Sequence, residues 1–355
     1  MRTFAIQKHV MEQKNFDPDG VGVDNGTYFG LPFAPETAEL VLISAPWDVT
    51  VSYGAGAAYA PDAIIEASTQ LDFHDPLAPG VWRRGIATAD VDYSLLDESQ
   101  RLRGDAAKVI DHLEGGGCLE DDYVVRKVRR VNEGCMSMNA NIGAQASRWL
   151  DAGKTVGLVG GDHSTPYGLV QALGERGEGF GILHIDAHCD LRRAYEGFEY
   201  SHASIMYNVL RDVPQAERIV EVGVRDYCDA EAELARSSER IRMFDDTQLS
   251  AAAFEGETWG ATCRRIVAEL PERVYVSFDV DGLSVEYCPH TGTPVAGGLT
   301  FNQAVYLLHE TVRSGRRIIG FDVVEVVPRP GSSIDASTGA RILYKLCGLT
   351  LKSEL

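Results

Sequence analysis

Eight short runs of β-branched and aromatic residues alternate with longer amphipathic segments, and this alternation limits the folds open to the chain. The runs span residues 40–45, 85–89, 155–159, 180–185, 218–224, 240–244, 273–278 and 317–321. The clearest segments of helical length and periodicity span residues 122–151, 257–270, 301–314 and 337–351. Alternation of this kind predicts an α/β fold of three layers, with a mostly parallel eight-stranded sheet covered by helices on both faces.

The length of 355 residues, of which 45% are hydrophobic, suits one large domain. Residues 1–38 contain Gly, Pro and Asp with weak periodicity. We therefore expect an N-terminal extension over residues 1–38, packed on the domain or on a neighbouring subunit, and a single domain over residues 39–355.

Acidic residues outnumber basic ones, 52 to 33, and the net charge of -19 argues against nucleic acid and anionic membranes as partners. The seven cysteines show no paired short spacing, so we expect no disulfide framework and a reducing, cytoplasmic location. The N-terminus lacks an apolar core of signal-peptide length, and no apolar run approaches about 18 residues. Export and a membrane span are therefore not expected.

Three polar motifs follow three of the predicted strands and suggest one metal site. They read GGDHS over residues 160–164, DAHCD over 186–190 and DVD over 279–281. Because side chains alternate along a strand, Asp186, His188 and Asp190 are expected on one side. Asp279 and Asp281 are expected to share one side for the same reason. The carboxyl ends of parallel strands meet at one edge, so these groups should converge with Glu325, which follows a fourth strand.

A single buried His or Asp is usually structural, but convergence of the whole set favours metal binding, because the charges would otherwise be buried without compensation. Two imidazoles with several carboxylates suit Mn²⁺, Ni²⁺ or Fe²⁺ better than a thiolate-rich zinc site. Carboxylate bridges suit a pair of ions roughly 3.5 to 4 Å apart. We interpret Cys189, which lies between two expected ligands, as a core residue.

The three motifs, their order and their separation resemble the ureohydrolases, the arginase and agmatinase superfamily, whose signatures are GGDHS, DAHxD and SFDxDxLDP. The resemblance continues through TGTP (291–294) and GGLT (297–300) and covers about residues 40–351. It implies an arginase-like fold and a ureohydrolase domain. The chain departs from the family pattern at Ser284-Val285, where Asp-Pro is usual, which leaves the geometry of that loop open.

The resemblance implies two divalent ions per subunit, Mn²⁺ or Ni²⁺, with Asp186 and Asp279 as bridging ligands. The implied ligands are His163, Asp186, Asp190 and Asp279 for one ion, and Asp186, His188, Asp279 and Asp281 for the other. A water between two such ions becomes a hydroxide near neutral pH, able to attack the carbon of a guanidinium. Asp190 is expected to orient this hydroxide and to help move its proton.

His202 corresponds by motif position to the family's histidine after the metal loop, which makes it the candidate proton shuttle to the leaving amine. The alternative for His202 is a surface or capping histidine before a helix. Glu325 is expected to form a charge-assisted pair with the guanidinium, and its alternative is an ordinary salt bridge at a strand end.

The substrate pocket is less determined by the sequence. Tyr195, with two other aromatic residues of its loop, is expected to form a wall, Glu196 to receive a second cationic end, and Thr50 or Ser52 to contribute a hydroxyl. A Gly-rich turn is the alternative for the loop around Thr50. The arginase residues that hold the amino-acid end of arginine have no counterpart here, so L-arginine is disfavoured.

The segment from Ala194 to Asn208 resembles an agmatinase-like branch that includes guanidine hydrolases, which prefer nickel. We therefore expect urea release from a guanidino compound, with free guanidine ahead of agmatine and a guanidino acid next. Formiminoglutamate hydrolysis is a further alternative, and a metal-stabilised regulatory protein without turnover is the non-enzyme alternative. The family implies a homo-trimer or homo-hexamer.

Overall fold

The computed structural model describes residues 16–355, and within them one eight-stranded sheet contains only parallel pairings. Its strands are β1 (Leu40–Ala45), β2 (Ile86–Thr88), β3 (Thr155–Gly160), β4 (Phe180–Ile185), β5 (Ala216–Val222), β6 (Ile241–Phe244), β7 (Arg273–Asp279) and β8 (Arg317–Val324). Their order across the sheet is β2-β1-β3-β8-β7-β4-β5-β6. This confirms the predicted eight-stranded α/β architecture, and β3, β8, β7 and β4 occupy its centre.

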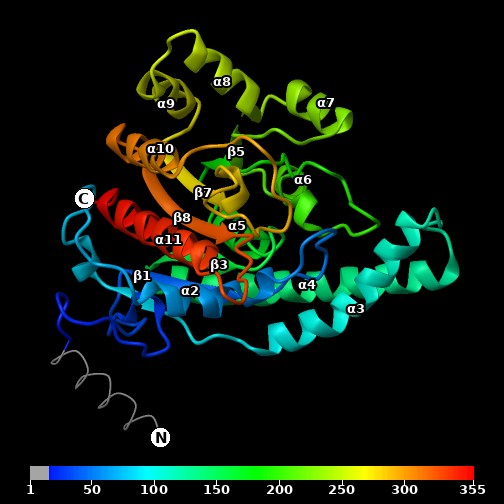
Figure 1. The fold of residues 1–355 in the computed structure, drawn as a ribbon, viewed down its shortest axis with the longest axis horizontal. Helices are drawn as coiled ribbons and strands as arrows, with labels where there is room; N and C mark the ends of the chain where they lie inside the picture. The colour runs from blue at the N-terminus through cyan, green and yellow to red at the C-terminus, as the bar shows by residue number, and fades with distance from the viewer. Residues whose placement is uncertain (1–15) are drawn as a thin grey trace, which may run out of the picture.

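Helices cover both faces of the sheet and give three layers (Figure 1). They are α2 (Ala60–Ser68), α3 (Ser94–Glu114), α4 (Asp122–Asp151), α5 (Tyr167–Gly174), α6 (Ile205–Asp212), α7 (Asp229–Ser237), α8 (Asp246–Phe254), α9 (Trp259–Ala268), α10 (Phe301–Arg313) and α11 (Ile334–Lys352). One buried cluster includes residues of α2, α9, α10 and α11, and a second includes residues of α3 to α6. Within residues 16–355, no helix combines the length and the apolar character that a membrane crossing requires.

The predicted elements form where local sequence and packing agree. Strand β1 and helix α4 have the predicted bounds, and each carries a clear apolar pattern. Strand β8 continues to Val324, three residues beyond the prediction, and therefore places Glu325 directly at its end. Helix α10 starts with a capping box between Thr300 and Gln303, which satisfies backbone donors of its first turn.

Part of the expected N-terminal extension lies on the domain's own core, while residues 1–15 fall outside the described residues. Tyr28, Phe29 and Leu31 are buried. The ring of Phe29 lies 5.1 Å from that of Tyr344 in α11, and the Tyr28 hydroxyl hydrogen-bonds Ser44 of β1 at 2.8 Å. This segment therefore joins the hydrophobic core beside the first strand.

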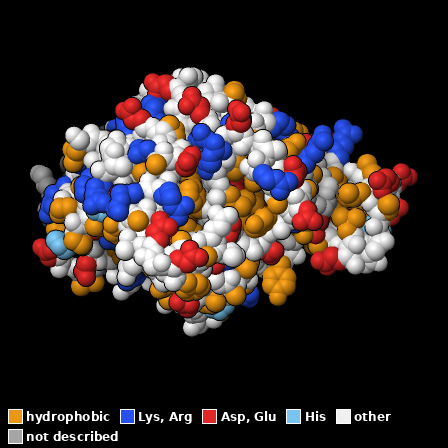
Figure 2. All heavy atoms as spheres, turned by 90° about the horizontal axis from the view of Figure 1, so that it is seen from above, with side chains coloured by type: hydrophobic (Ala, Val, Ile, Leu, Met, Phe, Trp, Pro, Cys, Tyr) orange, Lys and Arg blue, Asp and Glu red, His pale blue; other side chains and the backbone are white. Residues whose placement is uncertain are grey.

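The net negative charge does not produce a uniformly acidic surface on the face drawn in Figure 2. Acidic and basic side chains are interspersed there, with hydrophobic groups between them.

Candidate active site

The three polar motifs and Glu325 meet at the carboxyl edge of the four central strands. His163 follows β3, Asp186 follows β4, Asp279 ends β7, and Glu325 follows β8. These strands are consecutive neighbours in the sheet. Their sequence positions are far apart, but parallel pairing brings their ends to one edge, as predicted.

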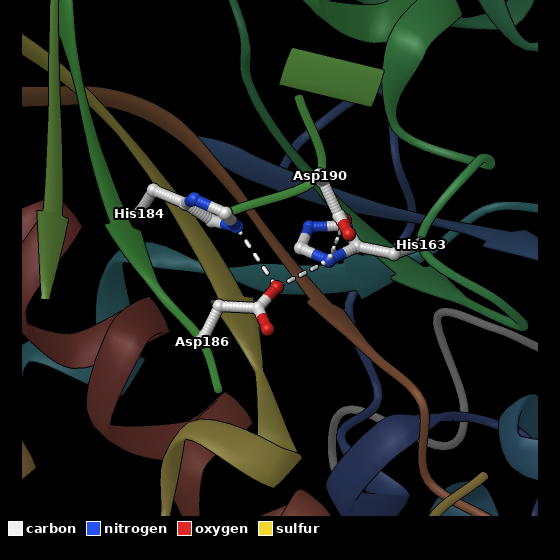
Figure 3. Close-up of side chains that lie close together, drawn as sticks. All are labelled: His163, His184, Asp186 and Asp190. Atoms are coloured by element: carbon white, nitrogen blue, oxygen red, sulfur yellow. Dashed lines mark hydrogen bonds and ion pairs between the residues drawn. The ribbon is translucent and has the colours of Figure 1, made fainter. Parts of the chain in front are cut away.

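The side chains of the motifs form two groups that share Asp186. Figure 3 shows Asp186 with His163 and Asp190 of the first group and with the neighbouring His184. In the first group, Nδ1 of His163 lies 2.9 Å from Oδ2 of Asp186, 3.1 Å from Oδ2 of Asp190 and 3.2 Å from Oδ2 of Asp279. In the second, Nδ1 of His188 lies 3.1 Å from Oδ2 of Asp281 and 3.4 Å from Oδ1 of Asp186. The structure thus brings all six expected ligands together.

The rule of strand ends explains this convergence, but the second reason, alternation of the ligands along strands, is wrong. Strand β4 ends at Ile185, and residues 186–190 form a loop in which Asp190 has a φ of 52°. Backbone donors shape this loop: the N–H of His188 donates to Oδ1 of Asp186 at 2.6 Å. Asp281 lies in a short 3₁₀ turn, Val280–Gly282, after β7. Loop folding, and not strand periodicity, therefore positions the ligands.

The site favours positive charge. Burial acts to lower the pKa of His163, but the carboxylates of Asp186 and Asp190 raise it well above its usual value. Burial also acts to lower the pKa of His188, but the negative charge of Asp281 outweighs it and raises this pKa to about 12. Burial and the charge of Asp186 raise the pKa of Asp190 to about 6. A carboxylate cluster of this kind attracts cations.

The residues present fit divalent metal ions. Nδ1 of His163 is buried without a well-formed hydrogen bond, although three carboxylate oxygens surround it. Imidazole nitrogen together with several carboxylate oxygens is a donor set for Mn²⁺, Ni²⁺ or Fe²⁺. Cys189 is buried in the hydrophobic core, as expected.

Glu325 is a buried carboxylate that faces the same site. Its Oε1 accepts a hydrogen bond of 2.8 Å from the N–H of His163, and its φ of 62° is left-handed. Burial, and then the charge of Asp162, raise its pKa well above the usual value. Among residues 16–355, no Lys or Arg makes an ion pair with Glu325, so the simple salt-bridge alternative does not apply.

His202 lines the same site and is held through its Nδ1. This nitrogen is 3.3 Å from Oγ of Ser201 and 3.5 Å from Oγ1 of Thr50, while the backbone N–H of His202 donates to the same Thr50 oxygen at 3.2 Å. The capping function belongs to Ser201, whose hydroxyl accepts from the N–H of Ala203. Burial, and then the positive charges of His188 and His163, lower the pKa of His202 to about 3.

These groups line a pocket of about 150 Å³, and its other lining residues agree only partly with those predicted from the sequence. Ser52 and Tyr195 line it, as expected. Thr50 is fully buried and supports His202 instead. Glu196 does not line the pocket: it has a φ of 54° in the turn between Tyr195 and Phe198, and its Oε2 is buried without a hydrogen bond.

Four charged or polar residues of the pocket were not foreseen: Arg192, Asp226, Glu231 and Thr293. The Arg192 guanidinium stacks 4.7 Å from the centre of the Tyr195 ring, and its Nε lies 3.7 Å from Glu231. Asp226 is exposed and has no ion-pair partner within residues 16–355. Asp226 lies in the loop after β5, so the rule that identified the metal motifs also points to it, whereas Glu231 lies in the first turn of α7, where that rule gives no signal.

The unusual Ser284-Val285 pair does not disturb the ligands. The N–H of Ser284 donates to the carbonyl of Leu299 at 2.7 Å, beside an isolated bridge between Leu283 and Leu299. This pairing closes the loop beyond Asp281, whose Oδ1 still accepts from the N–H of Ala187.

Comparisons with known proteins agree with this geometry. The sequence profile described as the Arginase family matches residues 38–348. An N(1)-aminopropylagmatine ureohydrolase of Thermus thermophilus is 31% identical over 314 residues, 88% of this chain and 91% of that protein. An agmatinase of Bacillus anthracis is 27% identical over 295 residues, which are 82% of this chain and 85% of that protein. The agmatine ureohydrolase structure of Thermoplasma volcanium superposes with a TM-score of 0.67 at 20% identity, over 97% of this chain and 98% of that one.

Proposed function

Since the chain belongs to the Arginase family and is a hydrolase of amidine C–N bonds, we propose that it releases urea from a small guanidino compound at a binuclear metal centre. The observation that carries the proposal is the common pocket: Glu325, His202 and the carboxylate cluster face one cavity of about 150 Å³. A guanidinium placed there contacts the carboxylate of Glu325 while its carbon lies beside the metal ligands.

Two cations supply, when bound, a nucleophile by lowering the pKa of a water molecule. His163, Asp186, Asp190 and Asp279 would hold one ion, and Asp186, His188, Asp279 and Asp281 the other. Mn²⁺ and Ni²⁺ both suit these donors. If the substrate is free guanidine, the resemblance noted above favours nickel.

The remaining steps belong to residues of the chain. Glu325 binds and orients the planar guanidinium, with one oxygen already fixed by the N–H of His163. Asp190 accepts the proton that the attacking oxygen loses as the C–O bond forms, and the C–N bond breaks as the leaving nitrogen gains a proton. Because Ser201 and Thr50 engage Nδ1 of His202, its Nε2 is the atom available to deliver a proton to the leaving nitrogen.

The charges at the pocket mouth favour a substrate with a cationic tail, such as agmatine or an aminoalkyl derivative. Asp226 offers an exposed carboxylate without an ion-pair partner among the described residues, whereas Arg192 is engaged with Glu231 and Tyr195. The names of the relatives from Thermus and Bacillus point the same way. A guanidino acid would place its carboxylate beside Asp226 and is therefore disfavoured.

Free guanidine, the first substrate expected from the sequence, is the second candidate, and the small volume of the pocket supports it. A homo-oligomer and a cytoplasmic location remain predictions. The test is urea release by protein loaded separately with Mn²⁺ and Ni²⁺, assayed with agmatine, guanidine, guanidinobutyrate, guanidinopropionate and arginine. Fastest release from agmatine supports the proposal, and fastest release from guanidine selects the second candidate. Silence with all five, despite two bound ions, would contradict both and favour a formimino substrate or a regulatory protein.

A further inference from the structure

A row of four polar residues crosses the centre of the sheet one layer beneath the metal ligands. Asp322 of β8, Ser277 of β7, His184 of β4 and Glu221 of β5 are consecutive register partners, and all four are fully buried. Register partners in a parallel sheet point to the same face. This set, called the polar row below, has Leu158 and Met243 as its neighbours at the two ends.

Two members of the polar row, Ser277 and His184, form hydrogen bonds with expected metal ligands. Oγ of Ser277 hydrogen-bonds Nε2 of His163 at 2.9 Å, on the ring atom opposite the carboxylate cluster. Nε2 of His184 lies 2.9 Å from Oδ2 of Asp186, as Figure 3 shows. Partners of this kind fix the orientation of metal ligands and tune metal affinity.

Two neighbouring members of the row, His184 and Glu221, keep polar atoms without partners. With Nε2 directed at a carboxylate, His184 has only Nδ1 left, and this atom is buried without a hydrogen bond among the described residues. Both carboxyl oxygens of Glu221, the register partner of His184, are also buried without a well-formed hydrogen bond, and the thiol of Cys189 is the polar side chain that lies near them. Unpaired buried polar atoms are rare, so their occurrence on two adjacent residues requires an explanation.

We propose that Glu221 and His184 are positioning residues that hydrogen-bond to each other through Nδ1, and so hold Asp186, the carboxylate shared by the two ligand groups. The inference rests on the proposed metal centre. A protonated Glu221 donates to Nδ1, and a carboxylate accepts from an imidazolium, so either form leaves Nε2 as the donor to Asp186. The competing view is that Glu221 only fills space in the core beside the thiol of Cys189 and does not act on His184.

Matched variants separate these views. The amide of Glu221→Gln can donate to Nδ1, so this variant should bind metal within about threefold of the parent protein. Glu221→Leu fills the same space without a donor, and it should weaken the tighter metal site by about 10- to 100-fold. Ile219→Val, two residues earlier on the same face of β5, is the control for core destabilisation and should leave metal affinity unchanged.

The experiment is calorimetric titration of the metal-stripped full chain with Mn²⁺, supported by the visible spectrum of bound Co²⁺ and by thermal unfolding. His184→Leu removes the proposed bond from the other side, so the effects of His184→Leu and Glu221→Leu should not add in the double variant. Parent-like affinity in Glu221→Leu, or a Glu221→Gln variant as impaired as Glu221→Leu, would overturn the inference. Absence of metal binding by the parent would instead overturn the proposed metal centre itself, and with it the inference.

Discussion

The backbone N–H of His163 donates a hydrogen bond of 2.8 Å to Oε1 of Glu325. One residue belongs to the loop after β3 and the other to the end of the neighbouring strand β8. The bond therefore couples an expected metal ligand to the group that we assign to guanidinium binding. It also fixes one carboxylate oxygen of Glu325 and leaves Oε2 to the substrate.

Glu325→Gln should reduce kcat/KM for urea release by roughly 10²- to 10³-fold, because the neutral amide cannot form an ion pair with a guanidinium. Its carbonyl oxygen can still accept from His163, so metal content and fold should be retained. Steady-state kinetics and elemental analysis measure the two effects. Parent-like kinetics would rule out the role assigned to Glu325.

His202→Asn should lower kcat by about 10²- to 10⁴-fold, the usual contribution of a positioned proton donor. Metal binding should change little, because no contact joins His202 to the carboxylate cluster directly among the described residues. His112→Asn, on α3 outside the pocket, is the matched control. Equal activity of the two variants would show that His202 is not the proton shuttle.

Asp226→Asn should raise the KM for agmatine about fivefold or less, since an exposed ion pair contributes up to about 1 kcal/mol. The KM for free guanidine should stay constant, because guanidine has no tail. Asp229→Asn, an exposed acid at the start of α7 that does not line the pocket, is the control. An equal change for both substrates would argue against tail recognition by Asp226.

The pKa of Glu196 should make the protein less stable as the pH rises. Burial, and then the charge of Glu114, raise this pKa to about 7. The folded chain therefore retains a proton that the unfolded chain loses above its ordinary pKa, so this contribution to stability declines between roughly pH 4.5 and 7. Glu196→Gln has no carboxyl group to titrate at this position. Its free energy of unfolding, relative to that of the parent, should therefore increase as the pH rises from about 4.5 to 7.

Urea denaturation at pH 4.5, 6 and 8 measures this difference, with the exposed neighbour Glu199→Gln as the control. A constant difference between Glu196→Gln and the parent across these pH values would contradict the assignment.

Removal of metal should lower the thermal unfolding temperature of the protein. Asp186, Asp190, Asp279 and Asp281 are buried together and repel one another unless cations are present. An ion at a hundredfold excess over its Kd stabilises the folded state by about 2.7 kcal/mol. Calorimetry of chelator-treated and Mn²⁺-loaded protein measures the effect, which should saturate at two ions per chain. No shift would speak against ions bound among these carboxylates.

The strands and the edge where the ligands meet were predictable because their signals are local. Runs such as 40–45 combine β-branched residues with clear boundaries, and the carboxyl-end rule then locates His163, Asp186 and Asp279. The path of the chain after each strand was not predictable. Backbone hydrogen bonds shape the loop that brings Asp190 to the site, and the alternation expected there does not exist.

The polar row could not be predicted from the sequence, for a different reason. A lone His184 or Glu221 inside an apolar strand carries no periodic signal, and only the register of β4 with β5 shows that the two residues are adjacent. Similarly, Glu196 turns away from the pocket because a two-residue turn sets its direction. Pairing and turn geometry, which depend on distant partners, decide such details.

The left-handed backbone of Asp190 and Glu325 has a consequence for the evolution of this scaffold. Non-glycine residues adopt such φ values at a cost of about 1 to 2 kcal/mol each, and glycine would relieve it. Of the four left-handed non-glycine residues among residues 16–355, these two are therefore the ones at which a stabilising glycine would remove a carboxylate that the proposed chemistry needs. Backbone relaxation at Asp190 or Glu325 would thus trade turnover for stability, whereas the same relaxation at Glu196, outside the pocket, would leave the carboxylates of the site in place.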